Sequence, residues 1–158
     1  MYPTKNDLSE ATRRQMVELL NARLADAIDL QTQTKQAHWN VKGPSFIALH
    51  KLFDEINEDV EDYVDLIAER AVQLGGTAEG TARSVARRST LPEYGAKGEG
   101  GREHVLALSS ALAAFGKLAR AAIAQTSEDA DTADIFTEIS RGVDKWLWFV
   151  EAHLQAER

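Results

Sequence analysis

Residues 45–76, SFIALHKLFDEINEDVEDYVDLIAERAVQLGG, decide the fold predicted for this chain of 158 residues. Pro44 comes directly before the stretch, and Gly75-Gly76 ends it in the manner typical of a helix C-terminus. Apolar side chains recur within it at spacings of three and four, the period of one face of an α-helix. We therefore predict a helix over 45–74, whose apolar face is formed by Leu49, Leu52, Phe53, Ile56, Val60, Tyr63, Val64, Ile67, Ala71 and Leu74.

The same spacing predicts three more long helices. One precedes the quoted stretch, over about 8–38, and begins near Asp7 or Ser9. Two follow it, over about 102–126 and 131–156. With 44% hydrophobic residues, the chain can form one core, and we expect a single domain over its whole length.

A long connection lies in the middle of the chain. Seven of the ten glycines fall between 75 and 101, and a weak helical pattern covers about 79–88. Two short links and one long crossover are typical of the ferritin-like wiring of a four-helix bundle. An up-down-up-down bundle would not need so long a central connection. The predicted fold class is therefore all-α, a ferritin-like four-helix bundle whose crossover carries a short helix.

The composition excludes several kinds of protein. The chain has 25 Asp and Glu against 18 Lys and Arg, a formal net charge of -7, which disfavours a generic binder of polyanions. It has no Cys, so disulfides, thiolate nucleophiles and thiolate metal sites are absent, and any metal must be held by His and carboxylate. No secretory leader and no run of 18 apolar residues is visible, so we expect a cytoplasmic protein with no membrane span.

The charge is concentrated on the helix predicted over 45–74. Within 52–69 this helix has eight carboxylates and no Lys or Arg, and several of the acids stand one turn apart, where like charges repel. Two readings remain open, a solvated acidic face or a face that binds cations. The eight acids are Asp54, Glu55, Glu58, Asp59, Glu61, Asp62, Asp65 and Glu69.

Two pairs on this helix have the spacing of metal ligands. His50 and Asp54 lie four residues apart and combine the nitrogen and oxygen ligands that suit iron or zinc. Asp65 and Glu69 form a second such pair on the same side, but eleven residues separate Asp54 from Asp65, or about 16 Å along the axis. One chain therefore cannot bring both pairs to one ion. Two copies of the helix, antiparallel about a two-fold axis near residues 59 and 60, would form two identical sites.

His38 is the third candidate imidazole. Alone it reads more simply as a buried or hydrogen-bonded His, but Pro44 turns the chain so that the next helix starts beside it, and with the His50 pair we interpret it as a ligand. His104 and His153 have no such carboxylate spacing, and we treat them as surface or packing residues. The Glu-x-x-His motif of metal sites inside four-helix bundles does not occur, which leaves the surface between subunits.

The chain resembles the Dps family of mini-ferritins over nearly its whole length. The resemblance rests on motifs with the family's spacing, and they lie in two blocks. The first comprises KQAHWNVKGPSF at 35–46, Leu49-His50-x-x-Phe53-Asp54, Asp65-x-x-Ala68-Glu69-Arg70 and Leu74-Gly75, and the second comprises DTADI at 131–135 and DKWLWF at 144–149.

The resemblance implies a hollow homododecamer that oxidises Fe(II) with hydrogen peroxide, or with O2, and stores ferric oxide, protecting DNA and the cell from oxidative damage. It implies a two-iron ferroxidase centre between subunits, which Zn or other divalent ions can also occupy. Its ligands would be His38, His50 and Asp54 of one subunit and Asp65 and Glu69 of the two-fold partner. The same five residues follow from the spacing argument.

The resemblance implies further roles. Trp39 matches the family's aromatic residue beside the centre. Asp129 and Asp134 resemble acids that line three-fold pores for iron entry, with Asp131 and Glu128 as helpers. The ferric mineral must also nucleate on internal carboxylates.

Roles are also predicted for three residues on the outside of the predicted helices. Glu55 and Glu58 are candidates for mineral nucleation, although Lys51 places a positive charge beside them. Trp148 lies about 160° from the core stripe of its helix. It is either a single exposed aromatic or part of a subunit interface, and we favour the interface.

A nucleoid-associated protein that binds DNA, with incidental iron binding, is the main alternative, and a shell that binds metal without turnover is another. Family members that condense DNA usually carry a Lys-rich tail, whereas Lys5 and Arg158 are the basic residues outside the predicted helices at the two ends. A dodecamer would have a formal charge of about -84, twelve times that of one chain. We expect weak or absent DNA binding, in spite of a local cluster of Arg83, Arg87 and Arg88.

Overall fold

The computed structural model describes residues 1–96, 98 and 100–155. It contains five helices and, within those residues, no strand beyond one isolated bridge between Lys42 and Gly100. The predicted all-α class, with four long helices and a short helix in the crossover, is confirmed. The helices are α1 (Glu10–Asn40), α2 (Phe46–Gln73), α3 (Ala82–Arg88), α4 (Gly101–Gln125) and α5 (Ala130–Gln155).

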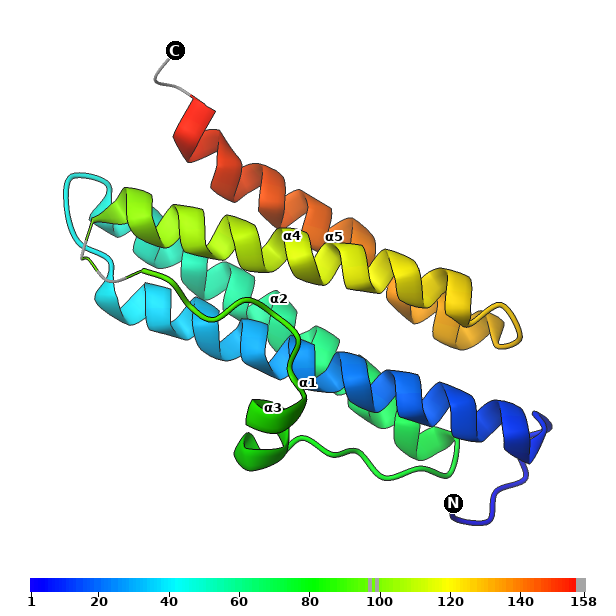
Figure 1. The fold of residues 1–158 in the computed structure, drawn as a ribbon. Helices are drawn as coiled ribbons and strands as arrows, with labels where there is room; N and C mark the ends of the chain where they lie inside the picture. The colour runs from blue at the N-terminus through cyan, green and yellow to red at the C-terminus, as the bar shows by residue number, and fades with distance from the viewer. Residues whose placement is uncertain (97, 99, 156–158) are drawn as a thin grey trace.

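The four long helices form two antiparallel pairs. The first pair is α1 with α2 and the second is α4 with α5, and the crossover carries α3 along the outer side of α1 (Figure 1). The largest fully buried side chains include Phe53 of α2, Phe115 of α4 and Phe136 of α5. Burial of a side chain of this size contributes about 1.5–3 kcal/mol, so this shared core holds the two pairs together.

Two helix boundaries differ from the predicted ones. α1 was expected to end near His38 but continues to Asn40, because the N–H of the extended Val41 still bonds to the carbonyl of Ala37. The crossover helix begins at Ala82 rather than near Glu79, since the backbone N–H of Glu79 is bound by a side chain of α1.

A row of polar side chains on α1 holds the crossover. Asn21 bonds to the carbonyl of Thr77 and to the N–H of Glu79, each at 2.9 Å. Further along, Asp26 accepts bonds from Thr90, Asp29 from Ser89, and Gln33 donates to the carbonyl of Pro92. The steps along the row are three to five residues, close to one helical turn, so a long connection without strands stays on one side of α1. Asn21, Asp26 and Gln33 are buried by these contacts.

The end of α2 is fixed by a glycine. Gly75 has a φ of +84°, a conformation that side chains rarely adopt. A Cβ there would lie 2.7 Å from the backbone oxygen of Tyr2, whose N–H donates to the Gly75 carbonyl at 2.7 Å. Arg13 also donates to the carbonyl of Leu74. The first residues of the chain are thereby held against the C-terminus of α2.

α4 is long and apolar enough in composition to cross a membrane, which the sequence reading did not anticipate. One apolar face of α4 nevertheless packs in the bundle, where Leu108, Leu112 and Phe115 are fully buried, whereas Leu106 on another side is exposed. In this fold α4 is a core helix.

We predict that Asp26→Ala lowers the free energy of unfolding by about 3 kcal/mol, because it breaks a buried ion pair. Asp26 is 0% exposed, lies 2.9 Å from Nε of Arg23 and accepts two bonds from Thr90. Urea denaturation at a fixed protein concentration measures the change. Glu18→Gln, an exposed change on the same helix, should shift stability by less than about 0.5 kcal/mol. Equal stabilities of the two variants would contradict the assigned role.

Candidate metal centre

His38 and His50 face one another across the turn that joins α1 to α2. Nδ1 of His38 lies 2.8 Å from the carbonyl oxygen of His50, and Nδ1 of His50 lies 2.9 Å from that of His38. The two rings stack with their centroids 3.7 Å apart and an interplanar angle of 22°. Each histidine therefore orients the other, and neither ring is free to rotate.

These contacts fix the tautomer of both rings. A carbonyl oxygen only accepts, so each Nδ1 must carry the proton, and in the neutral ring the lone pair is on Nε2. The carbonyl of His38 is also one of the last four of α1, which have no partner inside the helix. Metal-binding histidines commonly have their second ring nitrogen held in this way. The pair is thus prepared to offer two Nε2 donors.

Asp54 adds a carboxylate one turn after His50. Its Oδ1 lies 3.8 Å from Nδ1 of His38 and is ion-paired with the ammonium of Lys35. The hydrogen bond from Lys35 holds the pKa of Asp54 below its ordinary value, and the two histidines act in the same direction, while burial opposes them. Asp54 is therefore an anion at neutral pH.

The sequence reading missed Lys35 and Phe46. Lys35 stands three residues before His38, on the same side of α1, so helical spacing could have identified it. Phe46 lies with its ring centroid 5.0 Å from that of His50 and covers one side of the imidazole. The spacing of Phe46 in the sequence does not predict this contact, because Phe46 is the first residue of α2 and the contact depends on the exact start of that helix.

The structure does not bring Asp65 and Glu69 to the other three residues. Both are exposed on α2, about three and four turns beyond Asp54. Among the described residues, no group of three or more His, Asp or Glu side chains is arranged to hold a metal ion. The donor set of two imidazoles and a carboxylate suits iron or zinc, but one chain provides only part of a coordination sphere.

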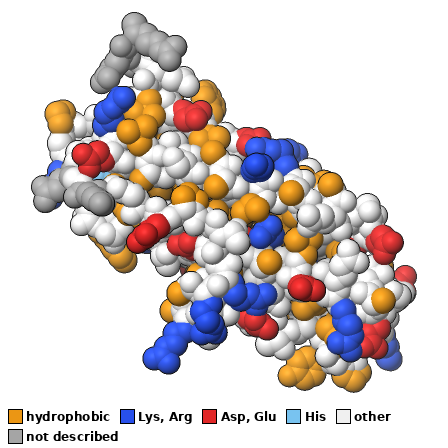
Figure 2. Space-filling model, in the orientation of Figure 1, with side chains coloured by type: hydrophobic (Ala, Val, Ile, Leu, Met, Phe, Trp, Pro, Cys, Tyr) orange, Lys and Arg blue, Asp and Glu red, His pale blue; other side chains and the backbone are white. Residues whose placement is uncertain are grey.

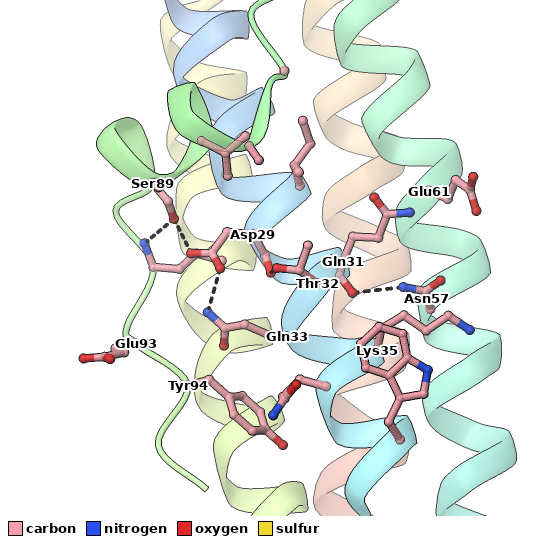
Figure 3. A pocket seen from close by; sticks show the side chains of 18 residues that line it. Asp29, Gln31, Thr32, Gln33, Lys35, Asn57, Glu61, Ser89, Glu93 and Tyr94 are labelled. Carbon is pink, nitrogen blue, oxygen red and sulfur yellow. Dashed lines mark hydrogen bonds between the residues drawn. The ribbon is translucent and has the colours of Figure 1, made fainter.

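A groove adjoins this incomplete site. It has a volume of about 1110 Å³ and lies between α1, α2, α3 and the crossover (Figure 3). Lys35 and Trp39 line it at the metal-site end, with Asn57 and Glu61 from α2 and Tyr94 from the crossover. Trp39 is 69% exposed. A large apolar ring left in water beside a groove is typical of a surface that another molecule covers.

The predicted pore residues occupy different environments. Asp129 is 4% exposed, and its carboxylate accepts two bonds from Arg70 at 2.7 and 2.9 Å. Burial raises the pKa of Asp129, but bonds from Thr132 and Arg70 outweigh it and lower the pKa. The carboxylate of Asp129 therefore lies inside the subunit, directly before α5, and its place beside a pore between subunits stays a prediction. Asp131 and Asp134 are exposed.

The remaining candidates lie as follows. Glu128 is exposed and accepts a weak bond from Thr12 at 3.4 Å. Glu55 and Glu58 are exposed on α2, as is Lys51. The other histidines differ: His153 is exposed and His104 is buried.

The chain was compared with known proteins. A ferritin-like domain model matches residues 17–158. A DNA protection during starvation protein of Agrobacterium fabrum (strain C58) is 44% identical over 156 residues, covering 98% of this chain and 96% of the relative. One of Mycolicibacterium smegmatis is 31% identical over 151 residues, covering 94% and 82%.

Solved structures agree with the sequence comparison. The tetragonal form of Mycobacterium smegmatis Dps superimposes with a TM-score of 0.93 at 30% identity and covers 98% of this chain and 95% of that one. DpsA14 from Streptomyces coelicolor gives a TM-score of 0.92 at 31% identity, covering 99% and 93%. Fold, wiring and sequence therefore lead to one conclusion: the chain belongs to the Dps family of ferritin-like proteins.

Proposed function

We propose that this protein oxidises Fe(II) and stores the ferric product, with its ferroxidase sites between two-fold-related subunits. The observation that carries the proposal is the His38–His50 pair, with both Nε2 atoms left as donors, beside the ionised Asp54. Asp65 and Glu69 of a second copy supply the missing anionic ligands. Membership of the Dps family supports the same assignment.

The chemistry follows from the donor set. The substrate is Fe(II), and hydrogen peroxide is the preferred oxidant, with O2 as the second candidate. Two Fe(II), one peroxide and two protons give two Fe(III) and two waters. The imidazoles and carboxylates hold the two substrate ions next to each other, so both electrons reach the peroxide together and no hydroxyl radical is released. Zn²⁺ would bind the same ligands without redox chemistry.

The assembly we propose is a hollow dodecamer. Antiparallel α2 helices about a two-fold axis near residues 59 and 60 bring the two halves of each site together and cover Trp39 and the groove. Trp148, 62% exposed on α5, is proposed to lie in a further contact between subunits. Asp129, Asp131 and Asp134 are proposed to line the pores, and Glu55 and Glu58 to nucleate the mineral.

A mixing experiment tests the shared site. His50→Ala and Asp65→Ala each remove one half of every site, so each variant alone should oxidise Fe(II) at the background rate. When equal amounts are refolded together, half of the dimers are mixed, and each mixed dimer regains one of its two sites. The ferric absorbance after peroxide addition should therefore recover to about a quarter of the wild-type rate.

The control pair is His153→Ala and Asp7→Ala, an exposed His and an exposed Asp away from the site. Both should keep the wild-type rate, alone and mixed. Full activity in either His50→Ala or Asp65→Ala would refute the ligand assignment, and no recovery on mixing would refute the shared site.

Lys35 should compete with metal for Asp54. Its ammonium is paired with the carboxylate that a metal ion needs, and both groups are about one third exposed, at 34% and 40%. Lys35→Met is expected to tighten Zn²⁺ binding by about three- to tenfold, the range for an ion pair worth about 1 kcal/mol. Calorimetry measures the change. Lys51→Met removes an exposed Lys that is next to His50 in sequence, and it should tighten Zn²⁺ binding less. Equal effects of the two substitutions would mean that the change in net charge, and not the pairing of Lys35 with Asp54, sets the affinity.

DNA binding is the second candidate function. Figure 2 shows basic side chains gathered over α3, where Arg83 and Arg87 are exposed. Arg88 is paired with Glu79, and the whole chain is acidic, so this patch is small against the net charge of -7.

We expect no retardation of supercoiled plasmid in a gel at ~150 mM salt, where exposed charges are screened beyond about 8 Å. A variant with an added lysine-rich N-terminal extension serves as the positive control. Retardation by the unmodified protein that disappears in Arg83→Glu, Arg87→Glu would show instead that α3 is a DNA-binding surface.

A further inference from the structure

His104 is a buried imidazole that the proposed chemistry does not use. It lies in the first turn of α4 and is 1% exposed. Its Nδ1 lies 2.5 Å from the hydroxyl of Tyr94 in the crossover, and the two rings stack with their centroids 6.1 Å apart. The contact joins α4 to the crossover at the point where the crossover reaches the metal-site end of the groove.

The other ring nitrogen faces α1. Nε2 of His104 is fully buried and has no hydrogen-bond partner of normal geometry among the described residues. Its neighbour is the backbone of Asn40, the last residue of α1. A neutral ring satisfies this arrangement best, since Nδ1 can accept from Tyr94 while Nε2–H points to the end of α1, where carbonyls lack helical partners.

The surroundings offer little support for a charged ring. Tyr94 faces it from the crossover, and burial raises the pKa of that phenol to about 12, so it stays neutral. Glu103, on the same helix, is the described carboxylate whose charge acts on the ring, but it is exposed and also binds the N–H of Gly98. From α1 the backbone of Asn40 acts on the ring. Burial outweighs Glu103 and Asn40, and it lowers the pKa of His104.

We propose that His104 is an acid-sensitive latch, which as a neutral ring holds Tyr94 and the crossover against α1 and α4, and which on protonation releases the crossover beside Trp39. Trp39 lines the groove together with Tyr94, which is labelled in Figure 3, so release changes the surface next to the proposed metal site. That this loosens the contact with a second copy rests on the proposed function. The latch itself does not depend on it.

The sign of the effect follows from linkage. Above the ordinary pKa of His, about 6.5, the ring is neutral whether the crossover is closed or open, and pH has no effect. Below it the open form binds a proton more readily than the closed form, so opening becomes easier as the pH falls. The equilibrium shifts further toward the open form until the pH reaches the lowered pKa of His104 in the closed form.

Hydrogen–deuterium exchange tests the latch in the full-length protein without added metal. Peptides covering 89–96 are followed at pH 7.5 and pH 5.0, and rates are divided by the intrinsic exchange rates. The corrected rate should rise at pH 5.0, by up to about tenfold for each pKa unit between the open and closed forms. Peptides from the middle of α5 should show no such step.

Three variants complete the experiment. His104→Gln cannot be protonated and should show no step, whereas His153→Gln, which changes an exposed His, should keep it. Tyr94→Phe should raise the exchange of 89–96 already at pH 7.5, by about fivefold for the loss of one hydrogen bond. If His104→Gln does not fold, the exchange of 89–96 in Tyr94→Phe at pH 7.5 tests whether the bond between Tyr94 and His104 holds the crossover. A step that persists in His104→Gln, equal steps in α5, or slow exchange in Tyr94→Phe at pH 7.5 would each overturn the latch, and none of these results depends on iron oxidation.

Discussion

The reciprocal bonds between His38 and His50 are the interaction on which the site depends. Each Nδ1 is occupied by the backbone carbonyl of the other residue, so the end of α1 and the start of α2 are fixed together at the place where a metal would bind. One pair of contacts thus satisfies a carbonyl at a helix end, sets the tautomers and leaves two Nε2 atoms as donors. Asp54 then needs only the helical period of α2 to lie beside them.

The negative charges of α2 need compensation, which comes in part from this arrangement. In one chain Asp54 and Asp65 are too far apart to share an ion, and the acids that stand one turn apart repel one another. Within the chain, Lys35 partly compensates the charge at Asp54. Lys145 and Trp146 of α5 bind Asp59 in the same way. For the other acids of α2 between 52 and 69, the proposed second copy with bound cations would reduce the repulsion.

The crossover depends on a different kind of contact. It has few large apolar side chains, and polar groups of α1 hold it instead: Asn21, Asp26, Asp29 and Gln33. Near the start of α4, the bond between His104 and Tyr94 is a further polar contact that holds the crossover. Most of the polar groups in these contacts have hydrogen-bond partners, and a buried polar group that loses its partner costs about 1–3 kcal/mol. A crossover held in this way is stable as a unit and sensitive to the change of a single group.

The sequence by itself determined the four long helices, the crossover and the ligand candidates, because helical period and i, i+4 spacing are local properties of the chain. It predicted His50 and Asp54 one turn apart on one helix, which α2 has, and it indicated that Asp65 and Glu69 could not join them in one chain. The tertiary structure alone decided that Asp129 is buried against Arg70, that Lys35 occupies Asp54, and that α1 carries a polar row for the crossover. Those facts depend on which residues distant in sequence meet. Spacing along one helix fixes the side a residue occupies, whereas its partner is set by the packing of the whole bundle.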